Sequence, residues 1–146
     1  MKIENIEFEN KLFAIIVRGD EEKEDTNLNN TSNDQIKFIS DESHSMQVAY
    51  HKQDKGHHYK AHISKPFQNG ANFLPNKVYL VQKGKIACRL FSLDGKLMGS
   101  VELNSGDLII FIYGGHDVDV LCDNSKFIEI KQGPYRGRED DKVFLE

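Results

Sequence analysis

The fold is decided by the stretch from Val101 to Tyr135, which reads V-E-L-N-S-G-D-L-I-I-F-I-Y-G-G-H-D-V-D-V-L-C-D-N-S-K-F-I-E-I-K-Q-G-P-Y. It contains short β-type segments at 107–113, 118–121 and 126–131, separated by residues that favour turns. The triplet Gly114-Gly115-His116 lies between the first two segments. The stretch therefore predicts a β-barrel with a histidine in a turn at its open end.

Short apolar segments of the same kind continue through the rest of the chain. Glycine is frequent, proline scarce and tryptophan absent, which suits an all-β sandwich or barrel better than a helical bundle. Asp94-Gly95 is a hairpin signal, because glycine tolerates a positive φ. The whole pattern predicts about ten strands in a single domain, 1–146. Outside the opening stretch, the predicted strands fall in 3–18, 36–40, 46–52, 56–64 and 77–103, with a loop at 66–76 and a terminal strand or short docked segment in 136–146.

Charge is unevenly distributed along the chain. The formal net charge is −4, and the segment from Asp20 to Glu42 holds eight acidic residues against two lysines. Residues 19–34 are almost free of apolar side chains and are predicted to form a solvated acidic loop, with docking of a basic partner as the alternative. The mildly basic remainder lacks the basic face of a nucleic-acid binder. This mildly basic remainder is compatible with a basic cavity that binds an anionic small molecule.

Cysteine content and hydropathy indicate the compartment. Cys88 and Cys122 are too few and too far apart for a disulfide framework or a Cys-x-x-Cys metal site, so we expect buried, reduced thiols. No apolar run reaches the length of a membrane span, and M-K-I-E-N-I-E-F lacks the apolar core of a signal peptide. We expect a soluble, cytoplasmic protein without a membrane partner.

Two parts of the chain carry a resemblance to a known family. H-H-Y-K-A-H-I-S, from His57 to Ser64, and Gly106-Asp107 leading to Gly114-Gly115-His116 resemble the two sequence motifs of the cupin superfamily. The resemblance implies a single-domain cupin barrel, a double-stranded β-helix of jelly-roll type that usually holds a metal or a small polar ligand. Most specifically through K-Q-G-P-Y-R-G, the chain is similar to small bacterial cupins often encoded beside genes for sugar-nucleotide or surface-polysaccharide synthesis.

The resemblance also implies a metal site of three histidines and one glutamate, because adjacent strands point alternate side chains into the barrel. His62 and His116 match two of these positions, whereas Ser64 and Lys77 stand at the other two. A lysine ammonium opposes a divalent ion unless burial removes its proton. Two alternatives follow: a degenerate site without metal, or a transition-metal site for Zn, Fe or Ni in which a shifted register recruits His57 or His58.

Other residues are candidates for ligand binding. Cations on strands attract carboxylate or phosphate in a barrel interior, and tyrosine or glutamine adds hydrogen bonds or stacks on a sugar ring. The candidates of these kinds are Lys77, Arg89, Lys131, Tyr79, Gln132 and Tyr135. The spacing singles out neither Glu129 nor Asp107 as an acid or base. By default, the remaining histidines are predicted at the surface: His44, His51, His57 and His58.

The leading interpretation is a cupin that binds a small polar, anionic metabolite, such as a sugar derivative, and is accessory to carbohydrate or polysaccharide biosynthesis. One alternative is a metal-assisted or acid/base isomerase or epimerase of an activated sugar, with His116 or His62 moving the proton. A second alternative is a non-catalytic scaffold or interaction protein. The resemblance implies a homodimer, and whether the protein is an enzyme stays open.

Overall fold

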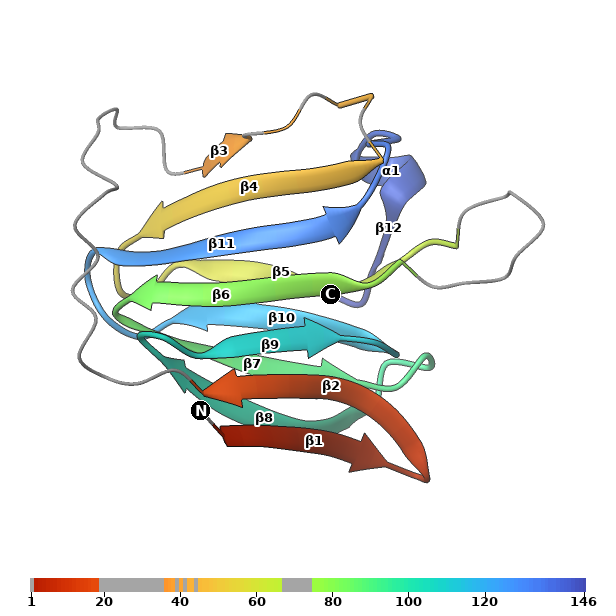
Figure 1. Cartoon of the computed structure of the whole chain (residues 1–146). Coiled ribbons are helices and arrows are strands. Elements are labelled where there is room, and N and C mark those ends of the chain that lie inside the picture. Colours follow the sequence, from red (N-terminus) through yellow and green to blue (C-terminus); the bar gives the residue numbers. More distant parts are fainter. Residues whose placement is uncertain (1, 19–35, 39, 41, 44, 67–74) are drawn as a thin grey trace.

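The computed structural model describes residues 2–18, 36–38, 40, 42–43, 45–66 and 75–146. The predicted acidic loop at 19–34 lies outside the described residues, as do His44 and most of the predicted loop at 66–76. The described part is mainly β-structure, in two antiparallel sheets that face each other (Figure 1). The all-β prediction is therefore confirmed.

The larger sheet has seven strands. In spatial order they are β1 (Lys2–Phe8), β2 (Lys11–Arg18), β9 (Leu108–Phe111), β6 (Lys77–Lys83), β11 (Ser125–Gln132), β4 (Met46–Gln53) and β3 (Ile36–Phe38). The smaller sheet has five strands. They are β12 (Lys142–Phe144), β5 (His58–Ser64), β10 (Gly115–Val120), β7 (Lys85–Phe91) and β8 (Leu97–Asn104).

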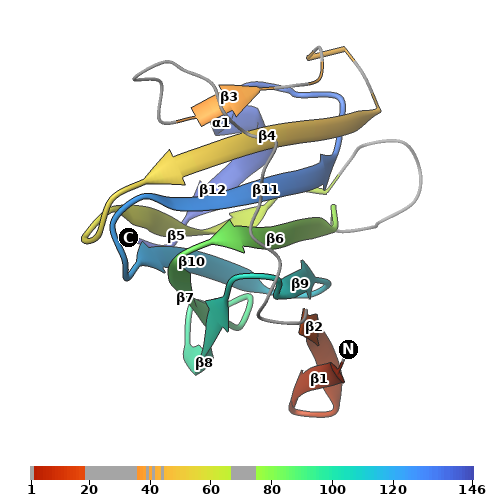
Figure 2. The ribbon, with the colours of Figure 1, turned by 60° about the vertical axis from the view of Figure 1, so that its left-hand side comes forward.

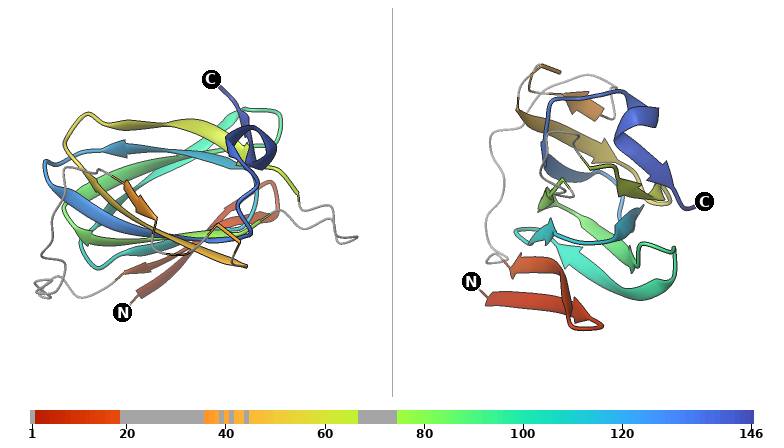
Figure 3. Two further views of the ribbon diagram at one scale, coloured as in Figure 1. Left: turned by 90° about the horizontal axis from the view of Figure 1, so that it is seen from above. Right: turned by 90° about the vertical axis from the view of Figure 1, so that its right-hand side faces the viewer.

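Both sheets bury their facing sides in one interior, as the view from above shows (Figure 3). Apolar and polar positions alternate along the strands, so that every second side chain points inward. Large apolar side chains fill the interior beside β2, β7, β8 and β9, among them Phe13, Ile16, Ile86, Leu90, Leu103 and Ile109. The polar inward-facing residues gather in another part of the interior, where β4, β5, β6, β10 and β11 face one another.

The described residues contain twelve strands, rather than about ten, and one short helix. At the end of the chain, where a terminal strand or a short docked segment was expected, the short helix α1 (Arg138–Asp141) is followed by β12. Both elements lie at the end of the sheets where β11 finishes (Figures 1 and 2). A three-residue strand pairs here with β5 through only a few residues, too short a segment to give a periodic signal.

His116 lies inside a strand, so its predicted place in a turn is wrong. The turn residue is Gly114, with a φ of 78°, and β10 begins at Gly115. A Cβ at Gly114 would stand 2.2 Å from the carbonyl oxygen of Phe91, which excludes a larger residue there. The glycine turn thus lets the chain reverse closely, and the inward-facing His116 follows at the second position of β10.

Two further predictions concern thiols and membranes. Cys88 is a buried free thiol, as predicted, but Cys122 is exposed. The expectation of two buried thiols is wrong for Cys122 because it lies in the turn after β10, beyond the reach of either sheet. In the part of the chain that the structure describes, no helix has the length and hydropathy of a membrane span.

Candidate functional site

Strand pairing brings His62 and His116 together. His62 on β5 lies directly opposite His116 on β10 in the antiparallel register, and directly opposed residues share one face of a sheet. Their ring centroids are 4.8 Å apart. Both side chains are buried. The predicted pair of inward-facing histidines therefore exists, in the smaller sheet.

Lys77 faces this pair from the larger sheet. It lies on β6 and is only 2% exposed. Its Nζ is 3.3 Å from Nε2 of His62 and 3.9 Å from a carboxylate oxygen of Glu129 on β11. A lysine, two histidines and a glutamate from four strands thus form one buried polar cluster, which we call the Lys77 cluster (Lys77, His62, His116 and Glu129).

The hydrogen bonds fix the protonation of His62. Its Nδ1 donates to the carbonyl oxygen of Lys60 at 2.8 Å, because a carbonyl can only accept. Nε2 of the neutral ring is then the acceptor for the Lys77 ammonium. Burial, reinforced by the charges of Lys77 and Lys142, lowers the pKa of His62 to about 3. His62 is therefore uncharged at neutral pH.

Burial also lowers the pKa values of Lys77 and His116. Burial lowers the pKa of Lys77 to about 8, although the charge of Glu129 opposes this shift. Burial and the charge of Lys77 hold the pKa of His116 well below its usual range. At pH 7 the Lys77 cluster therefore contains an ammonium, two neutral imidazoles and the Glu129 carboxylate.

Further side chains, on β4, β5 and β6, surround the Glu129 carboxylate. Nε2 of His51 lies 3.5 Å from the carboxylate, and the Tyr79 hydroxyl donates a hydrogen bond to it. Tyr59 accepts from Gln53 at 2.8 Å and contacts Nδ1 of His51 at 2.9 Å. Burial opposes ionisation of Glu129, but Lys77 and His51 outweigh it and keep the pKa of this carboxyl well below its usual range.

A small pocket opens beside the cluster. Its volume is about 10 Å³, close to the space that one water molecule needs. It is lined by Ser64, Pro75, Lys77, Phe111, Ile112, Tyr113, Gly114 and His116. The His116 ring stacks on Phe111 with centroids 3.8 Å apart. Among the described residues, its buried Nε2 has no hydrogen-bond partner, so the hydrogen-bonding capacity of this atom is unused.

No family model matches the sequence, and no curated protein matches it. Solved structures do. The structure of CapF with the inhibitor 3-isopropenyl-tropolone matches with a TM-score of 0.62 at 16% identity, over 80% of this chain and 33% of that one. An oxalate decarboxylase of Bacillus subtilis matches at 0.54 and 14% identity, over 70% of this chain and 24% of that one. This chain has the cupin fold.

The cupin fold does not by itself decide the chemistry. Procruciferin, an 11S globulin of Brassica napus, also matches, with a TM-score of 0.51 at 12% identity over 62% of this chain. This chain spans 22% to 33% of the length of the three solved proteins. Because an enzyme and a globulin share the fold, the function of this protein has to be argued from its own site.

The residues present do not fit the metal that the resemblance implies. Two histidines are present, but Nε2 of His62, the atom free to coordinate, faces the Lys77 ammonium at 3.3 Å. Lys77 also pairs with Glu129, the buried carboxylate of the cluster. A divalent ion would have to share this space with a cation that the sheets hold in place.

The other predicted ligand-binding residues divide into two groups. Tyr79 is buried against Glu129, and Lys131 is buried in an ion pair with Asp141 at 2.9 Å. The remaining three do not join the Lys77 cluster. Arg89 points to the outer face and binds Asp117, exposed Gln132 accepts from the backbone of Asn76, and Tyr135 lies against Lys131 with its ring centroid 5.0 Å from Nζ.

Sequence reasoning missed three residues. His51, expected at the surface, is buried, and Glu129 was not singled out. A signal for Glu129 existed in S-K-F-I-E-I-K-Q, since Phe127, Glu129 and Lys131 occupy alternate positions and share the inward face. Lys142 was missed because the expected terminal strand or docked segment in 136–146 had no predicted register, and therefore no predicted inward face.

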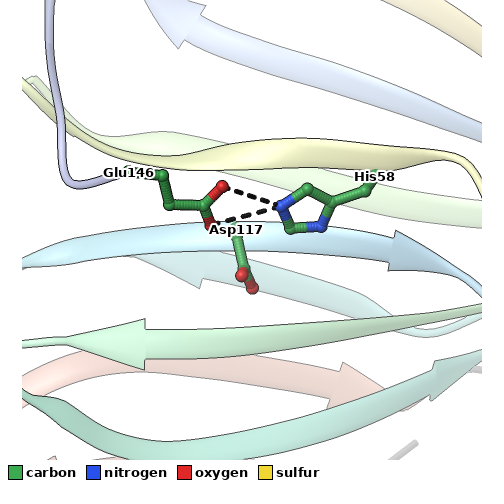
Figure 4. Close-up of side chains that lie close together, drawn as sticks. All are labelled: His58, Asp117 and Glu146. Atoms are coloured by element: carbon green, nitrogen blue, oxygen red, sulfur yellow. Dashed lines mark hydrogen bonds and ion pairs between the residues drawn. The ribbon is translucent and has the colours of Figure 1, made fainter.

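A separate cluster lies on the outer face of the smaller sheet. Ligand atoms of His58, Asp117 and Glu146 all lie within 4.8 Å of one another (Figure 4). Both Nε and Nη2 of Arg89 donate to the Asp117 carboxylate, which neutralises it. His58 contacts both Glu146 oxygens at 3.2 Å. The cluster is therefore a set of ion pairs that fastens the end of the chain to β5.

Proposed function

We propose that this protein binds a small polar anion at the pocket beside the Lys77 cluster, with one anionic oxygen in the water-sized cavity and the rest of the ligand outside it. One observation carries the proposal: a buried lysine ammonium faces a pair of neutral histidines, at the position where the resemblance predicts a metal-binding glutamate. Lys77 supplies a fixed positive charge in a region of low dielectric, where attraction for an anion is strong. The Lys77 ammonium thus supplies the positive charge that a metal ion would supply in the site implied by the resemblance.

The free polar atoms of the pocket support this proposal. Nε2 of His116 is buried without a hydrogen-bond partner among the described residues, and leaving such a group unsatisfied costs about 1–3 kcal/mol. A ligand oxygen that reached Lys77 would lie beside this ring, because both side chains line the same pocket. The ligand would gain a charge-assisted hydrogen bond from Lys77 and a second polar contact at His116.

The finer identity of the ligand follows from the sequence resemblance. We propose a sugar derivative that carries an anionic group, with a role accessory to carbohydrate or polysaccharide biosynthesis. Pro75, Ile112 and Tyr113 also line the pocket and offer an apolar and aromatic surface of the kind on which a sugar ring packs. The cytoplasmic location and the homodimer stay predictions.

The test is a titration monitored by the imidazole NMR signals of His62 and His116, with sodium acetate and glucose 1-phosphate as probes. We expect saturable shifts of both histidines with at least one probe. A paired variant, Lys77→Met with Glu129→Gln, removes the cation without leaving a buried unpaired carboxylate, and it should lose binding by about tenfold or more.

Lys83→Met is the matched control, since it removes an exposed lysine from the same strand. It should bind like the wild type. Absence of saturable shifts in the wild type, or equal binding by the paired variant, would overturn the proposal.

A further inference from the structure

Lys142 is an inward-facing residue on the edge strand β12. This strand pairs with β5 so that Lys142 lies opposite Ser64 and Phe144 lies opposite His62. Val143 between them is 48% exposed, as expected from the alternation of a strand. Phe144 approaches the His62 ring with centroids 6.1 Å apart. Lys142 therefore lies on the same face as the Lys77 cluster, opposite Ser64, which lines the pocket.

The carboxylates near Lys142 already form ion pairs with other cationic side chains. Asp141 accepts from Lys131 at 2.9 Å and from Arg136 at 3.1 Å. Glu129 pairs with Lys77. In the described part of the chain, no hydrogen bond or ion pair engages Nζ of Lys142. Burial lowers the pKa of Lys142, which is consistent with a partly desolvated ammonium that lacks a close counterion.

The charges on this side of the interior are unbalanced. Three lysines on this side of the interior, Lys77, Lys131 and Lys142, interact with two buried carboxylates, Glu129 and Asp141. An excess of buried positive charge costs free energy unless an anion compensates it. A ligand with two negative charges could interact with both Lys77 and Lys142, whereas a ligand with one could engage only one of them fully.

We propose that Lys142 is the second cation of the anion site and that it selects dianions, such as a dicarboxylate or a phosphate monoester, over monoanions. The C-terminal arm, which we define as residues 138–146, is then a part of the site. This inference rests on the proposed function, because it assigns a ligand class to the same pocket. Lys77 at the pocket wall and Lys142 opposite Ser64 would each engage one anionic group of the ligand.

The experiment compares two dianions, malonate and sulfate, with the monoanion acetate at pH 7, by the same histidine signals. We expect the wild type to bind at least one dianion about tenfold more tightly than acetate, the gain from one further charge-assisted contact. Lys142→Met should remove this preference, because it should weaken binding of the dianions about tenfold more than binding of acetate. Lys142→Arg, which keeps the charge, should retain most of the preference.

The outcomes separate this inference from the proposed function. If neither the dianions nor acetate bind to the wild type, the proposed function fails. If anions bind but the wild type shows no preference for dianions, or if Lys142→Met keeps the preference, the role of Lys142 is disproved while the pocket remains. Circular dichroism and the β12 amide signals of Lys142→Met establish that the arm is still docked; an undocked arm with an unchanged preference also contradicts the inference.

Discussion

Nζ of Lys77 lies 3.3 Å from Nε2 of His62, across the interior from one sheet to the other. The geometry places an ammonium against the imidazole nitrogen that is free to coordinate a metal. His62 is held as a neutral acceptor by its bond to the Lys60 carbonyl, and the ammonium is held by Glu129. The cluster is therefore internally consistent as a metal-free polar site.

The first prediction concerns metal content. The wild-type protein should retain far less than one equivalent of Zn, Fe or Ni, because the Lys77 ammonium competes for the same space. Lys77→Glu should gain affinity for Zn²⁺, since it adds a carboxylate beside two neutral imidazoles and Glu129. Elemental analysis of both proteins after dialysis against Zn²⁺ is the measurement. Lys77→Gln, which adds no charge, should stay metal-poor, and a metal-rich wild type would refute this picture.

The second prediction concerns the buried ion pair. Lys77→Met should lower the free energy of unfolding by about 3 kcal/mol or more, because Glu129 then loses its counterion inside the protein. Adding Glu129→Gln should recover most of this loss. Urea denaturation of the two single variants and the double variant gives the coupling energy. Simple additivity of the two single effects would show that the residues are not coupled.

The third prediction is a loss of stability in mild acid. The folded-state pKa of His62 is about 3, below its ordinary value, and that of His116 is also lowered. The unfolded chain therefore binds more protons below about pH 6.5, and stability present above that pH is lost as the pH falls toward the folded pKa values.

The slope should approach about 1.4 kcal/mol per pH unit for each histidine. Chemical denaturation between pH 7 and pH 5 measures it. His62→Gln should flatten the curve, whereas an unchanged slope in that variant would assign the effect to other groups.

The fourth prediction concerns the outer cluster of His58, Asp117 and Glu146. Glu146→Gln should change the free energy of unfolding by less than about 1 kcal/mol, because its pairs with His58 and Arg89 are partly exposed. It should leave the metal content unchanged. Thermal denaturation and elemental analysis test both statements. A clear drop in bound metal would instead identify this cluster as a metal site.

The strands and the His62–His116 pair were predictable because they depend on local signals. Turn residues and alternating side chains mark the strands, and the motif spacing placed both histidines inside. Lys77 was also placed correctly in the interior. Each of these residues lies in a long, periodic strand, where an inward position can be counted along the sequence.

The rest of the cluster depends on pairing between distant strands. His51 looks like a surface histidine in M-Q-V-A-Y-H-K, and only the register of β4 with β11 brings it to Glu129. Arg89 shows the opposite error: its alternation with Cys88 and Leu90 places it outside, where Asp117 binds it. Lys142 depends on a short edge strand, whose existence is decided by contacts with β5 and not by its own sequence.

The order of strands in the larger sheet has a kinetic consequence. β11 pairs on one side with β4, although the two segments are separated by about half the length of the chain. Closing such a long loop loses chain entropy, and this loss is offset only when the contacts between the strands form, late in folding. Topologies with many such pairings fold slowly. Glu129, on β11, can meet His51 on β4 only once this closure has occurred. Substitutions in the cluster are therefore expected to accelerate unfolding while leaving the folding rate nearly unchanged.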